Sequence, residues 1–186
     1  MADDKFYLDT RTPFIGADIP AVTLAATAKA LYPASNFPAL GGQYFAMIGK
    51  RLRIRLFGRM TTGATPGNGS FNVYYGTGAD ANGVLLMTGT PVALVAAGTN
   101  LSWALEIFIH CRSPGSAGTL FCTGRAIFPL GLHAAAVGPI LLPASAAAVS
   151  GACDLTAANI ISVQYLRSGS TAETMQVHDL EVVAMN

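Results

Sequence analysis

Leu101-Ser-Trp-Ala-Leu-Glu-Ile-Phe-Ile-His-Cys-Arg112 is the stretch that decides the fold, because its residues alternate between two faces. One face carries large apolar side chains and a cysteine, and the other carries polar and charged side chains together with Ala104 and Phe108. A period of two residues indicates a β-strand with one buried face. Twelve residues at about 3.3 Å each span roughly 40 Å, enough to cross a whole sandwich. We therefore expect Trp103 in the core of an antiparallel two-sheet sandwich.

A second alternating stretch, Lys50–Met60, predicts another long strand. Its apolar residues Leu52, Ile54 and Leu56 alternate with arginines. An unpaired charge is too costly to bury on the inner face of a core, so the arginines predict the outer face of this strand. The side chains expected on that outer face are Arg51, Arg53, Arg55, Phe57 and Arg59.

The rest of the chain shows weaker strands separated by turns rich in glycine and asparagine. The best helical candidate is Ala21–Leu31, but its residues fit the alternation of a strand as well as they fit a helix. Gly131–Ala152 is expected to form loop and short strands. About eight to ten short strands with glycine-rich turns are typical of an all-β, jelly-roll-like sandwich. We expect one such domain over residues 21–186. The weaker strands are expected at Val22–Thr27, Gln43–Met47, Ser70–Tyr75, Val84–Thr88, Val92–Val95, Thr119–Phe128, Asn159–Arg167 and Met175–Met185.

Residues 1–20 do not follow the strand pattern and are expected to form an extended N-terminal arm. They contain Pro13 and Pro20 and four apolar side chains that no sandwich strand would accommodate. Apolar side chains outside a core favour a groove on a neighbouring molecule. The apolar residues expected to bind a partner are Phe6, Tyr7, Phe14 and Ile15.

The composition predicts self-association. Only 11% of the residues are charged and 52% are hydrophobic, whereas ordinary domains have about 25% charged residues. Such a chain is expected to cover part of its surface with other protein, and we expect a homotrimer. The net charge of +1 favours neither nucleic acid nor a membrane surface as a partner. No run reaches the ~18 to 20 apolar residues of a membrane-spanning helix.

The residues of catalytic and metal sites are present but not in the patterns such sites need. His110, His133 and His178 show no metal-ligand spacing, and no Cys-x-x-Cys occurs. No Gly-x-Ser-x-Gly elbow and no phosphate-binding glycine loop is found. Glu106, on the outward face of its strand, is expected to pair with an arginine. We therefore expect no metal, no cofactor and no enzymatic activity.

The alternation of apolar residues is interrupted once near the C-terminus. The apolar positions near the C-terminus shift at His178-Asp179, which predicts a β-bulge.

Three cysteines are an odd number, which argues against a disulfide framework. Cys111 and Cys122 lie at similar distances from the turn at 113–118 and could face each other across a hairpin, but we favour buried free thiols.

The arginine strand is the one charged cluster of the sequence. Phosphate binding is an alternative, but only Phe57 interleaves with the arginines, so we favour a solvated face or a protein interface. The only glutamates are Glu106, Glu173 and Glu181. We expect at most one of them to reach the arginines, and an acidic partner to supply the remaining carboxylates.

Three stretches resemble a family of small virion proteins of tailed bacteriophages. They are Asn36–Phe45 leading into Gly49–Arg59, Phe71–Gly78 followed by Leu101–Glu106 and Cys111–Arg112, and Val177–Asn186. Such proteins look like jelly-roll modules that serve as capsid decoration, minor capsid or generic virion proteins. The resemblance covers residues 36–186. It implies assembly in a bacterial cytoplasm, where thiols stay reduced, and a final location in the virion.

The function expected from these observations is structural. The leading hypothesis is a capsid decoration or minor capsid protein that binds the major capsid protein or another virion protein and stabilises the head shell. A tail or baseplate component is the runner-up. A carbohydrate-binding, receptor-recognition jelly roll is the competing class, and its only candidate residues are Tyr74, Tyr75 and Asp80 near the loop 76–83.

Overall fold

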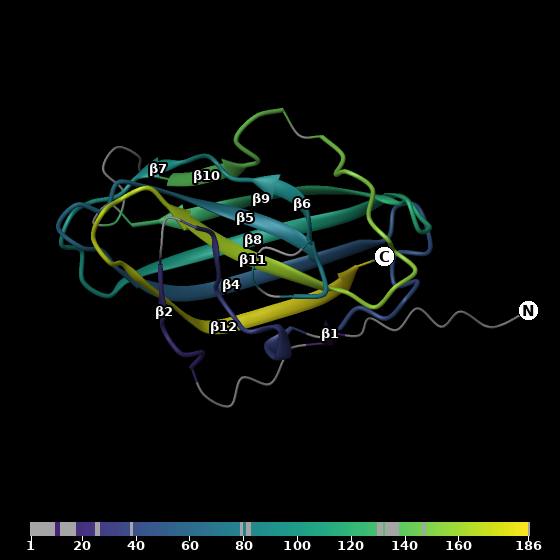
Figure 1. Cartoon of the computed structure of the whole chain (residues 1–186), viewed down its shortest axis with the longest axis horizontal. Helices are drawn as coiled ribbons and strands as arrows, with labels where there is room; N and C mark the ends of the chain where they lie inside the picture. The colour runs from purple at the N-terminus through teal and green to yellow at the C-terminus, as the bar shows by residue number, and fades with distance from the viewer. Residues whose placement is uncertain are drawn as a thin grey trace, which may run out of the picture.

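The computed structural model describes residues 10–11, 18–24, 27–37, 39–78, 80, 83–129, 132, 138–146 and 148–185. Two antiparallel sheets lie face to face (Figure 1), which confirms the predicted sandwich. Sheet A has the order β1 (Thr10–Arg11), β12 (Thr174–Met185), β4 (Arg51–Thr61), β8 (Leu101–Ser113), β9 (Thr119–Phe128) and β10 (Gly138–Leu142), and β2 (Val22–Thr23) also pairs with β12. Sheet B has the order β3 (Lys29–Ala30), β11 (Ile160–Arg167), β5 (Asn68–Gly76) and β6 (Gly83–Thr88), and β7 (Val92–Ala93) pairs with β5.

Aromatic side chains from both sheets meet at the centre of the core. The ring of Phe71 on β5 lies 5.6 Å from that of Trp103, 5.0 Å from that of Tyr165 and 5.7 Å from that of Phe128. Trp103 is 2% exposed, as its alternating strand predicts. Rings at these separations pack as they do in other protein cores. The two longest predicted strands thus supply the inner face of sheet A.

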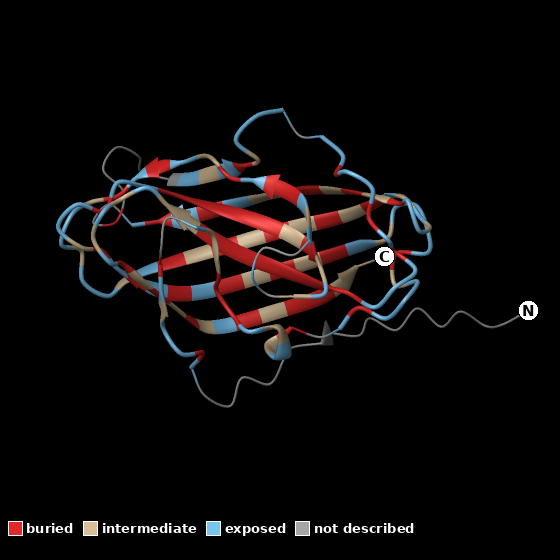
Figure 2. Cartoon of the chain, in the orientation of Figure 1, coloured by how far each residue is buried: buried red, intermediate tan, exposed pale blue. Residues whose placement is uncertain are grey.

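The outer faces of the two sheets differ (Figure 2). In sheet A, buried and exposed residues alternate along β4 and β8, so one face of the sheet is open to solvent. In sheet B, β11 is buried along most of its length, including the polar residues Ser162 and Gln164, which point away from the core. A docking surface on a sheet face is therefore available on sheet A and not at the centre of sheet B.

The predicted strand Gln43–Met47 is wrong. Residues 42–45 form a turn in which the backbone amide of Tyr44 donates to the carbonyl of Gly41, and Gln43 adopts a φ of 73°. A positive φ is incompatible with a strand. At Gly42 a Cβ would lie 2.3 Å from the carbonyl oxygen of Thr156, so only glycine allows this close approach. The apolar alternation of this stretch reflects a packed turn.

Other local predictions are confirmed or shortened. The helical candidate Ala21–Leu31 contains no helix in its described residues; β2 and β3 occupy parts of it. The predicted strand Val22–Thr27 is reduced to β2, and the strand predicted at Val92–Val95 to β7. The register of β12 against β4 shifts between Val177 and Asp179, which confirms the predicted bulge at His178.

Candidate partner-binding surface

The outer face of sheet A carries all four arginines that the sequence predicts for a partner-binding site. Antiparallel pairing aligns the outward residues of neighbouring strands into rows across the sheet. We call this surface the arginine face. It consists of Arg51, Arg53, Arg55, Phe57 and Arg59 on β4, Ala104, Glu106, Phe108, His110 and Arg112 on β8, Phe121, Thr123, Arg125 and Ile127 on β9, Leu141 on β10, and Glu181 on β12.

One row of the arginine face is a ladder of alternating charge. Glu181, Arg55, Glu106 and Arg125 lie opposite one another on four successive strands. The guanidinium of Arg55 lies 3.3 Å from the carboxylate of Glu106 and 3.6 Å from that of Glu181. Arg125 approaches Glu106 with Nη2 at 2.8 Å and donates from Nε at 3.0 Å. The ladder confirms the expectation that Glu106 pairs with arginine on a neighbouring strand.

The ladder also corrects the expected number of glutamates that reach the arginines. Two glutamates of the chain reach the arginine face, not one, since Glu181 also lies 3.4 Å from Arg53. Arg53, Arg55 and Arg125 share these two carboxylates, so most of their charge is compensated within the chain. Within the described residues, no carboxylate lies within 4 Å of Arg51, Arg59 or Arg112. These three are the arginines on this face that most need carboxylates from a partner.

The next row is apolar from β4 to β9, but the exposed Asp179 on β12 lies opposite Phe57. Phe57 lies opposite Ala104, and Ala104 lies opposite Ile127 on β9. Phe57 is 45% exposed and Ile127 is 46% exposed. With Arg55, Glu106 and Arg125 they line a shallow depression of about 220 Å³. Exposed aromatic and aliphatic side chains beside guanidiniums are the composition that protein interfaces favour.

The other end of the arginine face concentrates positive charge. Arg51 lies opposite His110, and His110 lies opposite Phe121, over whose ring the guanidinium of Arg112 sits at 4.5 Å. Partial burial, and then the charges of Arg51 and Arg112, lower the pKa of His110 below its ordinary value. His110 therefore stays neutral at neutral pH, and the arginines supply the charge. The adjoining turn exposes Ile48, with 73% of its surface in solvent.

The expected arm residues Phe6, Tyr7, Phe14 and Ile15 lie outside the described residues. Two described pieces of residues 1–20 lie along the edge of sheet A. Thr10–Arg11 forms β1 against β12, and the backbone amide of Ile19 donates to the carbonyl of Val177 at 3.1 Å. A carboxylate oxygen of Asp18 lies 2.8 Å from Nδ1 of His178. The bulge in β12 thus provides the side chain that fastens this segment.

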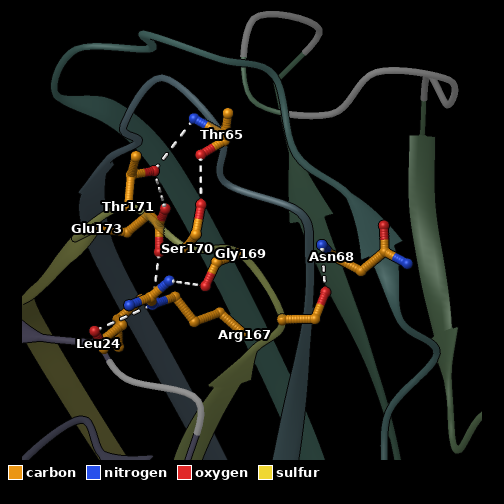
Figure 3. A network of polar contacts seen from close by, with 9 residues as sticks. Leu24, Thr65, Asn68, Arg167, Gly169, Ser170, Thr171 and Glu173 are labelled. Atoms are coloured by element: carbon orange, nitrogen blue, oxygen red, sulfur yellow. Dashed lines mark hydrogen bonds and ion pairs between the residues drawn. The ribbon is translucent and has the colours of Figure 1, made fainter.

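A buried ion pair between Arg167 and Glu173, which sequence analysis missed, joins Leu24 to the turn between β11 and β12 (Figure 3). Nε of Arg167 lies 2.7 Å from Oε2 of Glu173 and also donates to the carbonyl of Leu24, and its Nη1 donates to the carbonyl of Gly169. The hydroxyl of Thr171 donates to Glu173 at 3.0 Å. The side chain of Glu173 is 0% exposed. No periodicity marks these residues, because both flank a turn.

The loop around residues 76–83 does not gather the three sugar-site candidates. Tyr75 points into the core and is 4% exposed, whereas its neighbour Tyr74 points to the other face of β5. Asp80 accepts a hydrogen bond from the backbone amide of Ala30 at 2.9 Å and lies 3.6 Å from Nζ of Lys29. Its carboxylate therefore fastens the loop to β3.

The described residues hold no group of three or more metal-ligating side chains in one place. The three cysteines are free and buried, as expected. Burial raises the pKa of the thiols of Cys122 and Cys153, which lowers their reactivity as nucleophiles. Among the described residues, no helix is long and apolar enough to span a membrane.

Comparison with protein-family models, with curated proteins and with solved structures finds no match to this chain. Its candidate function therefore depends on its own residues.

Proposed function

We propose that this protein is a non-enzymatic structural protein of a virion, a capsid decoration or minor capsid protein that binds and stabilises the head shell of a tailed bacteriophage. The observation that carries the proposal is the arginine face. It is an open sheet face with exposed apolar side chains in one row, arginines paired with glutamates in the next, and at its ends arginines that have no carboxylate partner among the described residues.

The energetics of this face suit docking. The guanidiniums of Arg55 and Arg125 are already held by Glu106, so their side chains lose little conformational freedom when a partner arrives. Phe57 and Ile127 supply apolar area, which stabilises a contact by about 25 cal/mol per Å² removed from water. Arg51 and Arg112 can hold carboxylates of a partner with two hydrogen bonds each.

The resemblance of three stretches to small phage virion proteins is the reason for proposing a virion protein within this structural class. The low proportion of charged residues, 11%, fits a chain that works inside an assembly. Reduced, buried thiols fit assembly in a bacterial cytoplasm.

The test is a cryo-EM map of particles of the phage that encodes this chain, with mass spectrometry of purified virions. We expect density for the sandwich on the outer surface of the head, with the arginine face against neighbouring protein. Density only at the tail or baseplate would move the protein to the runner-up function. Absence of the chain from purified virions would overturn the proposal.

Binding to the shell can also be tested in solution. Particles that lack the chain are incubated with the wild-type protein and with Arg51→Glu. We expect wild-type attachment to weaken as salt rises, because exposed charges are screened within about 10 Å at 0.1 M. Arg51→Glu is expected to attach less. Lys29→Glu, which reverses a charge on sheet B, is the control and is expected to attach normally. Because this change also removes the contact between Lys29 and Asp80, circular dichroism verifies that the variant is folded.

A further inference from the structure

At both ends of the arginine face lie arginines with no carboxylate partner among the described residues, although Arg59 donates a hydrogen bond to the carbonyl of Asn100. Arg59 lies at one end of β4, and Arg51 lies at the other end beside Arg112. Arg59 lies eight positions after Arg51, which corresponds to about 26 Å along the strand. Between them lies the apolar depression lined by Phe57 and Ile127. A matching ligand is extended, carries carboxylates near both ends, and has aromatic or aliphatic side chains in between.

One segment of this chain has that composition. Three of its ten carboxylate residues, Asp3, Asp4 and Asp9, lie in residues 1–9. Lys5, Phe6, Tyr7 and Leu8 lie between these acids, so the side chains of the segment carry three negative charges and one positive charge. Asp3 and Asp9 lie six positions apart, about 20 Å in an extended chain, and the long arginine side chains can reach over the difference from the roughly 26 Å between Arg51 and Arg59. Residues 1–9 are therefore complementary to the arginine face in charge, hydrophobicity and length.

The direction of β1 decides whose arginine face these residues can reach. Thr10 lies opposite Val183 and Arg11 lies opposite Val182, so β1 runs antiparallel to β12. Thr10, the first described residue, therefore lies on the side of β1 that faces the end of sheet A at which β12 terminates, at Met185. The apolar row lies in the opposite direction, at the level of Phe57. Docking on the same molecule needs a reversal of direction within nine residues, whereas docking on a second copy needs none.

We infer that residues 1–9 of one copy dock on the arginine face of a second copy. Phe6 and Tyr7 cover the depression between Phe57 and Ile127, and the aspartates pair with Arg51, Arg59 and Arg112. The exchange is heterologous, because the donated segment and the accepting face are different surfaces, so it closes into a ring when the rotation between copies allows it. This inference holds whether or not the protein belongs to a virion. In a virion, the neighbouring protein that covers the arginine face is then a second copy of this chain.

Photo-crosslinking in the full-length chain tests the inference. The photoreactive residue p-benzoylphenylalanine replaces Phe6, the purified protein is illuminated, and the products are separated on a denaturing gel. We expect a product of twice the chain mass, in which mass spectrometry finds Phe6 joined to the peptide that contains Phe57 or the one that contains Ile127. The same probe at Leu85, 43% exposed on β6, controls for random collision and is expected to give no such product.

Charge reversal provides the second arm of the experiment. Arg51→Glu combined with Arg112→Glu is expected to weaken self-association roughly tenfold, since two exposed pairs together contribute about 1.4 kcal/mol. The yield of crosslinked dimer is expected to fall as self-association weakens. Lys29→Glu, the matched control on sheet B, is expected to leave both unchanged, and circular dichroism verifies that each variant is folded.

Three results would overturn the inference. Crosslinks confined to a single chain would mean that residues 1–9 fold back on their own copy. Crosslinks to peptides outside the arginine face, or none at all, would remove the proposed acceptor. A dimer yield indifferent to reversal of Arg51 and Arg112 would exclude the charge complementarity on which the inference depends.

Discussion

Arg55 and Arg167 both pair with glutamate, but they do so at opposite levels of burial. The side chain of Arg55 is 40% exposed on the arginine face, whereas that of Arg167 is 10% exposed and its partner Glu173 is 0% exposed. An exposed ion pair contributes about 0.2 to 1 kcal/mol, while removing one partner of a buried pair costs about 3 to 5 kcal/mol. The buried pair holds the fold together, and the exposed ladder is free to serve recognition.

The largest effect is expected from breaking the buried pair. Glu173→Ala leaves the guanidinium of Arg167 without its carboxylate and releases the hydrogen bond from Thr171. We expect the free energy of unfolding to fall by about 3 to 5 kcal/mol, measured by urea denaturation with Trp103 fluorescence as the probe. Glu173→Gln keeps an oxygen acceptor and is expected to lose less. A loss below about 1 kcal/mol for Glu173→Ala would remove the contrast between the two regions.

Alkaline pH probes the same buried region through Tyr165. Burial, with a smaller contribution from the nearby Glu173, raises the pKa of Tyr165 above its ordinary value of 10.0, and burial likewise raises the pKa of Tyr32. Above pH 10 the unfolded chain releases these protons first, so the folded state binds more protons and the free energy of unfolding falls as pH rises.

Tyr165→Phe separates this contribution from that of Tyr32. Within the described residues the hydroxyl of Tyr165 has no hydrogen-bond partner, so its removal is expected to change stability little at pH 7. Between pH 10 and 11 the variant is expected to lose less stability than the wild type. Parallel losses in urea titrations of the two proteins would mean that Tyr165 ionises normally in the folded state.

Breaking the exposed ladder is expected to cost much less. Glu106→Ala removes the carboxylate shared by Arg55 and Arg125, but Arg55 keeps Glu181 and Arg125 remains open to solvent. We expect a loss of about 1 kcal/mol or less in urea denaturation at low salt, and a smaller loss at high salt. A loss comparable to that of Glu173→Ala would show that the ladder supports the fold.

The smallest effect concerns a single unpaired cation. Arg51→Glu is expected to leave the melting temperature nearly unchanged, because Arg51 is exposed and has no carboxylate partner among the described residues. It is expected to raise the pKa of His110, since it replaces a repelling charge with an attracting one. NMR titration of the His110 ring measures this shift. A pKa that stays constant or falls would mean that the two side chains are not neighbours on the arginine face.

The long strands of sheet A were predictable because apolar and polar side chains alternate along them. Trp103 and the arginines of β4 lie on the faces that a period of two assigns to them. The turn at Gln43 was not predictable from alternation, because it depends on a backbone conformation and on close packing of Gly42 against Thr156. Short strands such as β3 were missed for a related reason, since two residues cannot establish a period.

The candidate surface was predictable in its residues but not in its electrostatics. Sequence spacing placed Arg53 and Arg55 on one face, yet only the register of three strands shows that Glu106 and Glu181 lie opposite them. The bulge at His178 adds to this uncertainty, because it shifts Glu181 by one position relative to a regular strand. Tertiary register, which no local pattern encodes, therefore decides which arginines remain unpaired.

The central claim is that the arginine face serves binding rather than stability. Sedimentation equilibrium of the full-length protein at about 0.05 M and about 0.5 M salt, with urea unfolding at the same two concentrations, tests it most directly. We predict that self-association weakens markedly at the higher salt while the free energy of unfolding changes by less than about 1 kcal/mol. The claim would be contradicted if the protein were monomeric at both salt concentrations. It would also be contradicted if self-association did not depend on salt while the free energy of unfolding did.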